Sequence, residues 1–241
     1  MIDTHEIGEL ADSLAAARQT GRLVDGFPAI DLATGYRIAA AMAPRLGPVR
    51  GWKIGATSAG AMNFLKIAAP IHGRLFALWQ DCETIDLPGS RAIEIEPEIL
   101  FTLGDDLTPV AAAFGVELNR PSFADPFGLG VGAIVADNAA SLGVLMGPML
   151  DLADLANPAE LVASLVVDGA TLATGSADTV LDNPRHAFDA LREQLGGDVR
   201  GLRPGDVIAT GAMCRSVQIG RGQTLAIDAG RWGRATMKLA A

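Results

Sequence analysis

Three glutamates in one segment have the spacing of side chains that could bind a divalent cation. In Ala92-Ile-Glu-Ile-Glu-Pro-Glu-Ile-Leu-Phe-Thr-Leu103, Glu94, Glu96 and Glu98 stand two residues apart. On a β-strand such residues share one face, and the isoleucines between them point into a core. Adjacent carboxylates repel one another unless water or a cation screens them, and Mg²⁺ and Mn²⁺ prefer oxygen ligands. The segment therefore predicts either a hard-metal site or the solvated outer face of a half-buried sheet.

A lysine among apolar residues is a second candidate for chemistry. Lys53 stands between Trp52 and Ile54 in a short strand bounded by glycines. A partly desolvated lysine has a lowered pKa and can transfer protons or bind a substrate carboxylate. In the alternative interpretation its stem packs on Trp52 and its ammonium group stays in water.

Two further segments place polar side chains beside turns. Asp137 and Asn138 follow an apolar run and can orient a substrate or the side chains around a metal, or can form a turn by bonding their own backbone. His72, in Pro70-Ile-His-Gly-Arg-Leu-Phe76, can act as a general acid or base near neutral pH. A lone histidine can equally be structural, so this segment leaves both interpretations open.

The start of the chain has the pattern of two helices. Asp3 is expected to cap the first, which ends at Gly21, because Glu6 completes a capping box and apolar residues follow at helical spacing. Asp31 is expected to start the second, which ends at Pro44. We therefore predict a helical N-terminal region over residues 1–47.

After residue 47, short apolar runs separated by Gly, Pro and Asp predict β structure. The expected strands are 51–55, 75–79, 92–103, 130–136, 143–146, 161–167, 171–176, 206–210, 216–219, 224–227 and 234–239, with one helix over 183–195. Pro97 removes a ladder donor, so its strand is an edge strand or is irregular there. Strands and helices do not alternate as in a nucleotide-binding parallel sheet. The pattern predicts an α+β fold whose catalytic domain, residues 48–241, is a mixed, mostly antiparallel β roll.

Composition limits the class of protein. The net charge of −9 argues against nucleic-acid binding, which needs a basic face. Hydrophobic residues make up 49% and charged residues 20%, as in a soluble folded protein. Cys82 and Cys214 are far apart, which argues against a zinc knuckle or a disulfide framework. We see no secretory signal and no membrane-spanning run, so a cytoplasmic protein that does not bind membranes is expected.

Four segments, in order along the chain, together resemble one enzyme family. They are Gly51-Trp-Lys-Ile-Gly-Ala-Thr-Ser58, Ile95-Glu-Pro-Glu-Ile-Leu-Phe101, Ala136-Asp-Asn-Ala139, and Leu202-Arg-Pro-Gly-Asp-Val-Ile-Ala-Thr-Gly211 followed by Gly222-Gln-Thr-Leu225. This order is similar to that of the 2-oxopent-4-enoate hydratase and 2-oxo-3-hexenedioate decarboxylase family of the fumarylacetoacetate hydrolase superfamily. The resemblance spans nearly the whole chain.

The resemblance implies roles for particular residues. Glu96 and Glu98 match a Glu-x-Glu pair that binds Mg²⁺ or Mn²⁺, and Glu117 is the candidate for the third ligand. Lys53 matches a lysine near the substrate, and Asp137 and Asn138 lie in the third signature. The implied substrate is a small 2-oxo acid, the implied assembly is a homo-oligomer, and the implied reaction is hydration of 2-hydroxypenta-2,4-dienoate in aromatic meta-cleavage catabolism.

The sequence also departs from the family pattern. Ile71 fills a position that often carries an acid in the family, and His72 beside it is our candidate replacement as proton carrier. Ser122 stands where the family places an arginine, with Arg120 nearby. The alternatives are a 2-oxo-3-hexenedioate decarboxylase, an acylpyruvate- or fumarylacetoacetate-type C–C hydrolase, a tautomerase, or a catalytically degenerate partner subunit.

Overall fold

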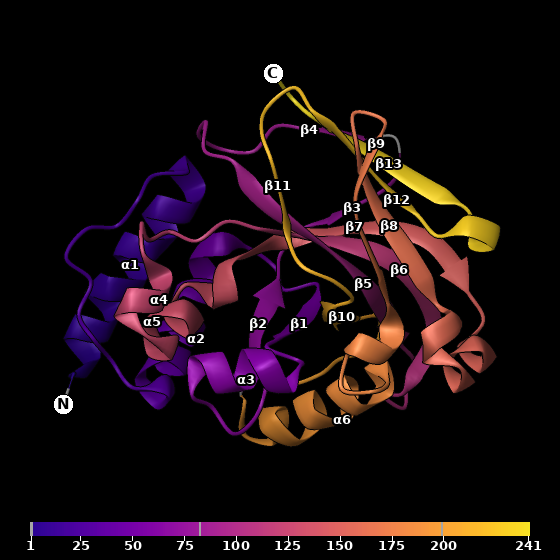
Figure 1. The fold of residues 1–241 in the computed structure, drawn as a ribbon. Helices are drawn as coiled ribbons and strands as arrows, with labels where there is room; N and C mark the ends of the chain where they lie inside the picture. Colours follow the sequence, from indigo (N-terminus) through magenta and orange to yellow (C-terminus); the bar gives the residue numbers. More distant parts are fainter. Residues whose placement is uncertain (1, 82, 199) are drawn as a thin grey trace.

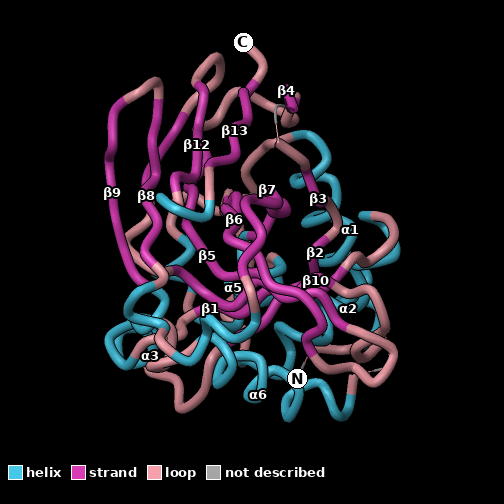
Figure 2. The backbone as a smooth tube through the Cα atoms, turned by 90° about the vertical axis from the view of Figure 1, so that its right-hand side faces the viewer, coloured by secondary structure: helices cyan, strands magenta, loops and turns pink. Residues whose placement is uncertain are grey.

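The strands of the protein form two curled sheets that fold over one another. The computed structural model describes residues 2–81, 83–198 and 200–241, and in these residues the sheets have eight and five strands (Figures 1 and 2). The larger sheet runs in the order β2 (Ile71–Leu75), β1 (Gly51–Gly55), β10 (Val207–Ala212), β5 (Ile93–Leu103), β6 (Pro109–Asn119), β7 (Ser141–Leu150) and β3 (Leu78–Trp79), and β11 (Val217–Ile219) also pairs with β5. The smaller sheet runs in the order β4 (Glu83–Ile85), β13 (Arg234–Leu239), β12 (Thr224–Asp228), β8 (Val162–Val167) and β9 (Ala170–Ser176).

Most neighbouring strands in these sheets are antiparallel. The parallel pairs are β1 with β10, β3 with β7 and β4 with β13. Apolar side chains from both sheets meet in one large core, which helix α6 (Pro184–Gln194) closes through Phe188, whose ring lies 6.3 Å from that of Phe101. The predicted α+β fold with a mixed, mostly antiparallel roll is confirmed.

The N-terminal helices α1 (Thr4–Thr20) and α2 (Leu32–Leu46) begin where the sequence predicts. The side chains of Asp3 and Asp31 accept hydrogen bonds from backbone N–H groups three residues on, and Gly21 ends α1 with φ of +72°. The predicted end of the second helix at Pro44 is wrong, since α2 continues to Leu46. A proline so close to the end of a helix removes one backbone hydrogen bond and leaves most of the helix unaffected.

The predicted strand over 130–136 is also wrong, because the chain is helical there. Helix α4 (Pro126–Leu129) leads into α5 (Val131–Ala136), which packs against α2 with Gly35 close to Gly132. A Cβ on Gly35 would lie only 2.3 Å from the Gly132 carbonyl oxygen, so the two helices approach at glycine. A short apolar run fits a strand and a buried helix equally well. Here packing against α2 stabilises the helical conformation. The domain boundary at residue 47 stays a prediction.

Strand β6 (Pro109–Asn119) is absent from the expected strands. Its first half, Pro109-Val-Ala-Ala-Ala113, has few of the β-branched and aromatic residues that favour strands. Hydrogen bonding to β5 on one side and to β7 on the other stabilises the strand conformation that this composition favours only weakly. This matters for function, because β6 carries Glu117.

Strand β5 lies in the interior of its sheet, so Pro97 does not mark an edge. On the side away from β6, residues 98–102 of β5 pair with β10 and residues 93–95 pair with β11. The register of the pairing with β10 shifts between Ala209 and Ala212. Pro97 accepts a hydrogen bond from the Met213 N–H at this break. The predicted irregularity is therefore confirmed. Helix α3 (Ala59–Leu65) follows β1.

Two sequence predictions concern cysteines and membranes. Cys214 is a free thiol, and Cys82 lies outside the described residues. None of the described helices combines the length and the apolar character needed to cross a membrane.

Candidate metal centre and active site

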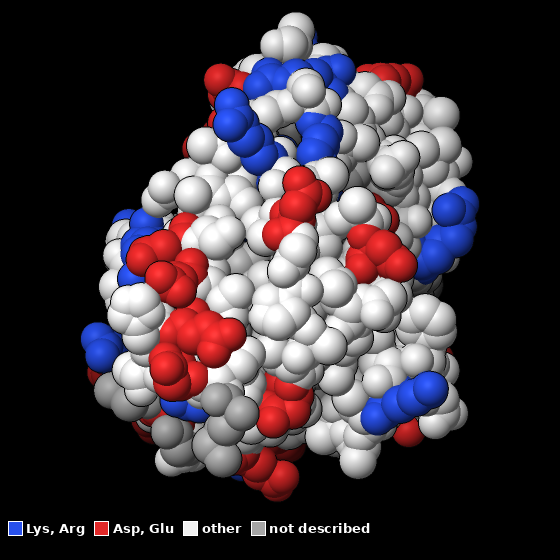
Figure 3. Space-filling model, turned by 90° about the vertical axis from the view of Figure 1, so that its left-hand side faces the viewer, with Lys and Arg blue, Asp and Glu red and all other residues white. Residues whose placement is uncertain are grey.

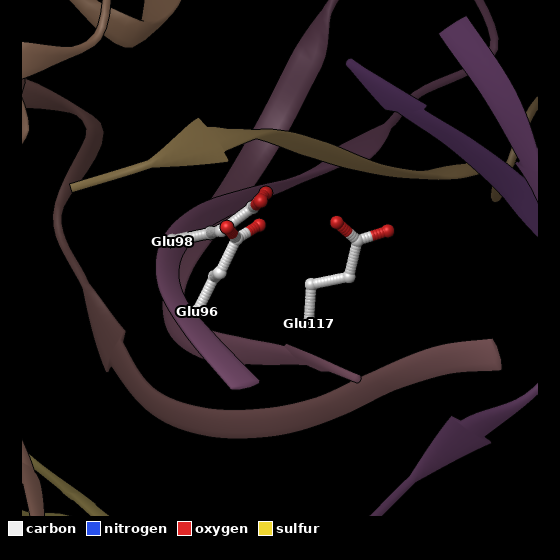
Figure 4. Close-up of side chains that lie close together, drawn as sticks. All are labelled: Glu96, Glu98 and Glu117. Carbon is white, nitrogen blue, oxygen red and sulfur yellow. The ribbon is translucent and has the colours of Figure 1, made fainter. Parts of the chain in front are cut away.

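Strand register brings the three carboxylates together. Glu96 on β5 stands directly opposite Glu117 on β6, and Glu98 lies two residues further along the same face of β5. Directly opposed residues on antiparallel strands have Cβ atoms about 5 Å apart. One carboxylate oxygen from each glutamate lies within 4.8 Å of the others, and Figure 4 shows the carboxylate of Glu117 across from those of Glu96 and Glu98.

Lys53 reaches this cluster from β1. Its Nζ lies 3.1 Å from Oε2 of Glu117, and both side chains are buried. Burial lowers the pKa of Lys53, but the charges of Glu117, Glu96 and Glu98 outweigh burial and raise that pKa above its ordinary value. The lysine is therefore held as an ammonium ion, contrary to the lowered pKa that the sequence suggested.

Two neighbouring groups orient the carboxylates. Asn119 Nδ2 donates to Oε2 of Glu117 at 3.1 Å and to Oε2 of Glu96 at 3.2 Å. The Gly211 N–H donates to Oε2 of Glu98 at 2.9 Å. Oε1 of Glu117 is buried and has no hydrogen-bond partner among the described residues.

The charge of the cluster calls for a cation. Burial and the Glu117 charge raise the pKa of Glu96 to about 7, and the same two causes raise the pKa of Glu98 well above its ordinary value. One ammonium group cannot balance three carboxylates of which two are buried and one is partly buried, and such groups prefer to bind protons or a metal ion. Three carboxylates, one with an unpartnered oxygen, fit the preference of Mg²⁺ and Mn²⁺ for oxygen ligands.

A cavity of about 170 Å³ opens beside the cluster. One wall is polar and carries Lys53, Glu94, Glu96 and Asn119. The remainder is mainly apolar, with Ala56, Ile71, Pro121, Pro126, Phe127, Ile134, Ala139 and Ala140, in addition to Gly55 and Asp137. Lys53 is the one cationic side chain among the described residues that line it. The exposed ring of Phe64 on α3 contacts that of Phe127 on α4, with ring centroids 5.2 Å apart.

His72 does not lie in this cavity. It follows Ile71 on β2, and successive strand residues point to opposite faces, so Ile71 lines the carboxylate cavity and His72 a different one. His72 stacks on Tyr36 with ring centroids 4.3 Å apart, and its Nδ1 lies 2.9 Å from Oε1 of Gln194. Burial lowers the pKa of His72. His72 therefore lies apart from the carboxylate cavity, and its role as the proton carrier stays a prediction.

Asp137 and Asn138 are buried and bonded to the protein. Asp137 pairs with Arg18 at 2.8 Å and accepts hydrogen bonds from the N–H and hydroxyl of Ser122. Asn138 exchanges two hydrogen bonds with the backbone of Arg74 on β2. Both residues fix the wall that follows α5, and Asp137 also lines the cavity. The predicted substrate contacts of these two side chains stay a prediction.

The sequence interpretation missed Asn119, Gly211 and Arg18. Asn119 lies two residues after Glu117, so strand periodicity alone places it on the same face. Gly211 ends the C-terminal signature and has φ of +117°, where a Cβ would collide with Thr57. No local signal identifies Arg18, which reaches Asp137 across 119 residues of sequence.

Comparison with solved structures defines the class of fold. Over 99% of both chains, the protein resembles 4-oxalocrotonate decarboxylase from Pseudomonas putida G7, complexed with magnesium and adipate, with a TM-score of 0.90 and 19% identity. It also resembles fumarylpyruvate hydrolase from Pseudomonas aeruginosa, complexed with Mn²⁺ and pyruvate, with a TM-score of 0.56 and 17% identity over 80% of this chain and 90% of that one. The protein therefore shares the fold of these two enzymes.

Sequence comparison narrows this class to a family. No family model matches the sequence. The chain is 30% identical over 231 residues to 2-keto-4-pentenoate hydratase of Paraburkholderia xenovorans (strain LB400), covering 85% of this chain and 84% of the relative. It is 28% identical over 240 residues to the protein of that name from Burkholderia vietnamiensis (strain G4 / LMG 22486), covering 88% and 89%. The chain belongs to the 2-keto-4-pentenoate hydratase family, as its motifs predict.

Proposed function

We propose that this protein is a divalent-metal-dependent hydratase of 2-oxopent-4-enoate, acting on its dienol form 2-hydroxypenta-2,4-dienoate. The observation that carries the proposal is the cluster of three glutamates and Lys53, of which Glu96 and Lys53 line a mainly apolar cavity. The relatives named 2-keto-4-pentenoate hydratase support the same reaction.

Glu96, Glu98 and Glu117 are the proposed ligands of Mg²⁺ or Mn²⁺. A bound ion of this kind supplies Lewis-acid polarisation of the substrate's oxygens and stabilises the negative charge that develops on the 2-oxo oxygen. Asn119 and the Gly211 N–H hold the carboxylates in place before the ion arrives. This fixed arrangement reduces the reorganisation that binding requires.

Lys53 is the proposed contact for the substrate's carboxylate. Its ammonium group faces the cavity and is fixed by Glu117. A hydrogen bond from Nζ to the carboxylate would orient the 2-oxo acid with its oxygens toward the glutamates and its carbon chain toward the apolar wall. Besides the proposed ligand Glu96, the titratable residues that line the cavity are Lys53, Glu94 and Asp137, and Asp137 is paired with Arg18.

The apolar wall favours a substrate with an uncharged tail. A 2-oxo dicarboxylate would place its second carboxylate beside Ile71, Ile134 and Phe127, where no described lining residue carries a compensating positive charge. Burying an unpaired carboxylate is unfavourable by several kcal/mol. This observation favours the hydratase over 2-oxo-3-hexenedioate decarboxylase.

A C–C hydrolase and a degenerate partner subunit are less well supported. A C–C hydrolase would need a His–Glu pair to activate water, and none of the three histidines lines the cavity. A catalytically degenerate partner subunit would have no reason to retain three buried carboxylates, whose mutual repulsion is unfavourable without a ligand.

The proposed setting follows the resemblance. We propose a cytoplasmic homo-oligomer that takes part in aromatic catabolism, as the meta-cleavage enzymes of this family do. Light scattering coupled to gel filtration tests the assembly, because a mass equal to that of one chain would exclude a homo-oligomer.

The decisive experiment follows the absorbance of 2-hydroxypenta-2,4-dienoate with the protein, in EDTA and then with added Mg²⁺ or Mn²⁺. Metal-dependent loss of the dienol, with 4-hydroxy-2-oxopentanoate identified by NMR, is the expected result. A companion measurement records deuterium uptake at C3 of 2-oxopentanoate in D₂O. If metal binds but neither hydration nor exchange is observed, the proposal is overturned. Exchange without hydration would indicate another reaction of the same enolate chemistry.

A further inference from the structure

Arg120 has a buried guanidinium group whose two terminal nitrogens have no hydrogen-bond partner in the part of the chain that the structure describes. The residue is 4% exposed. It follows Asn119 at the end of β6, and its backbone N–H donates to the Ala140 carbonyl. A buried charged group whose N–H donors have no acceptor is strongly unfavourable, so this group needs a ligand.

Other arginines surround Arg120. Burial and the charges of Arg91, Arg18 and Arg221 lower the pKa of Arg120 and outweigh the opposing charge of Asp137. Arg18 pairs with Asp137 and Arg221 pairs with Asp86. Among the described residues, no carboxylate lies within ion-pair distance of Arg91 or Arg120. The cluster therefore has an excess of positive charge in a protein whose net charge is −9.

A small cavity lies between these side chains. Arg91, Arg120 and Arg221 line it together with Gly89, Ile93 and Leu239. Its volume of about 10 Å³ is room for one particle of the size of water or chloride. On the face that carries the N-terminal helices, Figure 3 shows basic side chains gathered around a hollow at the top.

We propose that this cavity is a binding site for a small monovalent anion of the size of chloride. The Arg120 guanidinium donates hydrogen bonds to the anion, and Arg91 and Arg221 contribute positive charge. Water fits the same space but does not neutralise the charge. The site is distinct from the carboxylate cavity, because the two share none of their lining residues.

The anion site also connects to the segment that supports the carboxylates. Arg91 Nη2 donates to the Pro121 carbonyl at 2.6 Å, and Asn119 bonds Glu96 and Glu117. Anion binding at Arg120 therefore stabilises the turn that follows β6.

The test compares the melting temperature (Tm) in sodium chloride with that in sodium gluconate at equal ionic strength, because gluconate is too large for the cavity. We expect a saturable chloride-specific rise of roughly 3 °C when chloride is at about ten times its Kd. The rise should disappear in Arg120→Met and persist in the matched control Arg234→Met, which removes an exposed arginine at the start of β13. A crystal grown in bromide should show an anomalous peak beside Arg120.

Each other outcome overturns the proposal. Equal rises in chloride and gluconate would indicate an ionic-strength effect only, and a chloride rise that survives Arg120→Met would place the anion elsewhere. If Arg120→Met does not fold, the bromide crystal of the unmodified protein tests the proposal instead. A cavity that contains water and no bromide in that crystal would rule out the anion site.

Discussion

Nζ of Lys53 and Oε2 of Glu117 lie 3.1 Å apart in the interior of the protein. The two residues come from β1 and β6, which are separated in the sheet by β10 and β5. The ion pair therefore spans β10 and β5, and it places the ammonium group beside Glu96 and Glu98 of β5. The proposed metal site and the proposed substrate anchor share Glu117 in this arrangement.

Removing the ammonium group tests that relationship. In Lys53→Met, Glu117 loses its ion-pair partner, and the cavity loses the one cationic residue among the described residues that line it. We expect kcat/KM for the dienol to fall by at least about 100-fold. We also expect the metal-free protein to lose about 3 kcal/mol of stability, as when one partner of a buried pair is removed. Urea denaturation and the absorbance assay measure the two effects.

The matched control for this variant is Lys238→Met, which removes an exposed lysine of β13 in the smaller sheet. It should leave kcat/KM for the dienol and the stability of the metal-free protein near the values of the unmodified protein. A kcat/KM for Lys53→Met within threefold of the unmodified value would exclude Lys53 as the substrate anchor.

The metal ligands can be tested within a single strand. Glu96→Gln keeps the size of the side chain and removes a proposed ligand, whereas Glu94→Gln alters the exposed neighbour on the same face of β5. We expect the Mn²⁺ Kd from calorimetry to rise about 100-fold in Glu96→Gln and to change less than threefold in Glu94→Gln. Equal weakening in both variants would show that the strand attracts the ion by general charge and that Glu96 is not a specific ligand.

Much of this site was accessible from sequence because its parts are local. Alternation along 92–103 places Glu96 and Glu98 on one face, and the capping residues Asp3 and Asp31 fix the starts of two helices. The third glutamate depended on the family resemblance, because the Ala-rich first half of β6 has weak strand propensity. Its pairing with β5 and β7 is a property of the whole sheet and not of the segment.

The position of His72 outside the carboxylate cavity has a different physical reason. Ile71 and His72 are adjacent, so position along the chain places both near Lys53, but the pleat sends them to opposite faces of β2. A shift of one residue in register would exchange them. The contacts of Asp137 and Asn138 are similarly long-range, since Arg18 and Arg74 reach them from distant parts of the chain.

The stability of the metal-free protein should depend on pH in an unusual direction. The pKa of Glu96 rises from an ordinary value of 4.5 to about 7 in the folded protein. Between these values the folded state retains a proton that the unfolded chain has released, so the free energy of unfolding falls as pH rises. The loss from this one group is at most roughly 3 kcal/mol, and the raised pKa of Glu98 acts in the same direction.

Urea denaturation in EDTA at pH 5 and pH 8 measures this effect. Mg²⁺ should restore stability most strongly at the higher pH, because metal binding competes with protons at the carboxylates. Glu96→Gln should reduce the pH dependence of the metal-free protein. If the stability of the metal-free protein instead rises steadily from pH 5 to pH 8, the raised pKa values assigned to the glutamate cluster are contradicted.

His72 should affect stability and not catalysis. In His72→Phe the ring contact with Tyr36 is retained and the hydrogen bond to Gln194 is lost. We expect Tm to fall by a few degrees, corresponding to roughly 1 kcal/mol, while kcat/KM stays within about threefold. If the variant, at a temperature where it is folded, instead loses about 100-fold or more in kcat/KM, His72 is restored as a proton carrier.

The identity of the substrate's tail can be tested at Ile134. This residue of α5 lines the apolar wall and is only partly buried, so a longer side chain can extend from it toward the cavity mouth. Ile134→Lys should raise kcat/KM for 2-oxo-3-hexenedioate, relative to 2-hydroxypenta-2,4-dienoate, by at least about tenfold, because the new ammonium group pairs with the second carboxylate. Ile134→Met, similar in length and uncharged, should leave the ratio unchanged. If the unmodified protein already processes the dicarboxylate faster than the monocarboxylate, the apolar wall does not select the tail, and the decarboxylase becomes the better assignment.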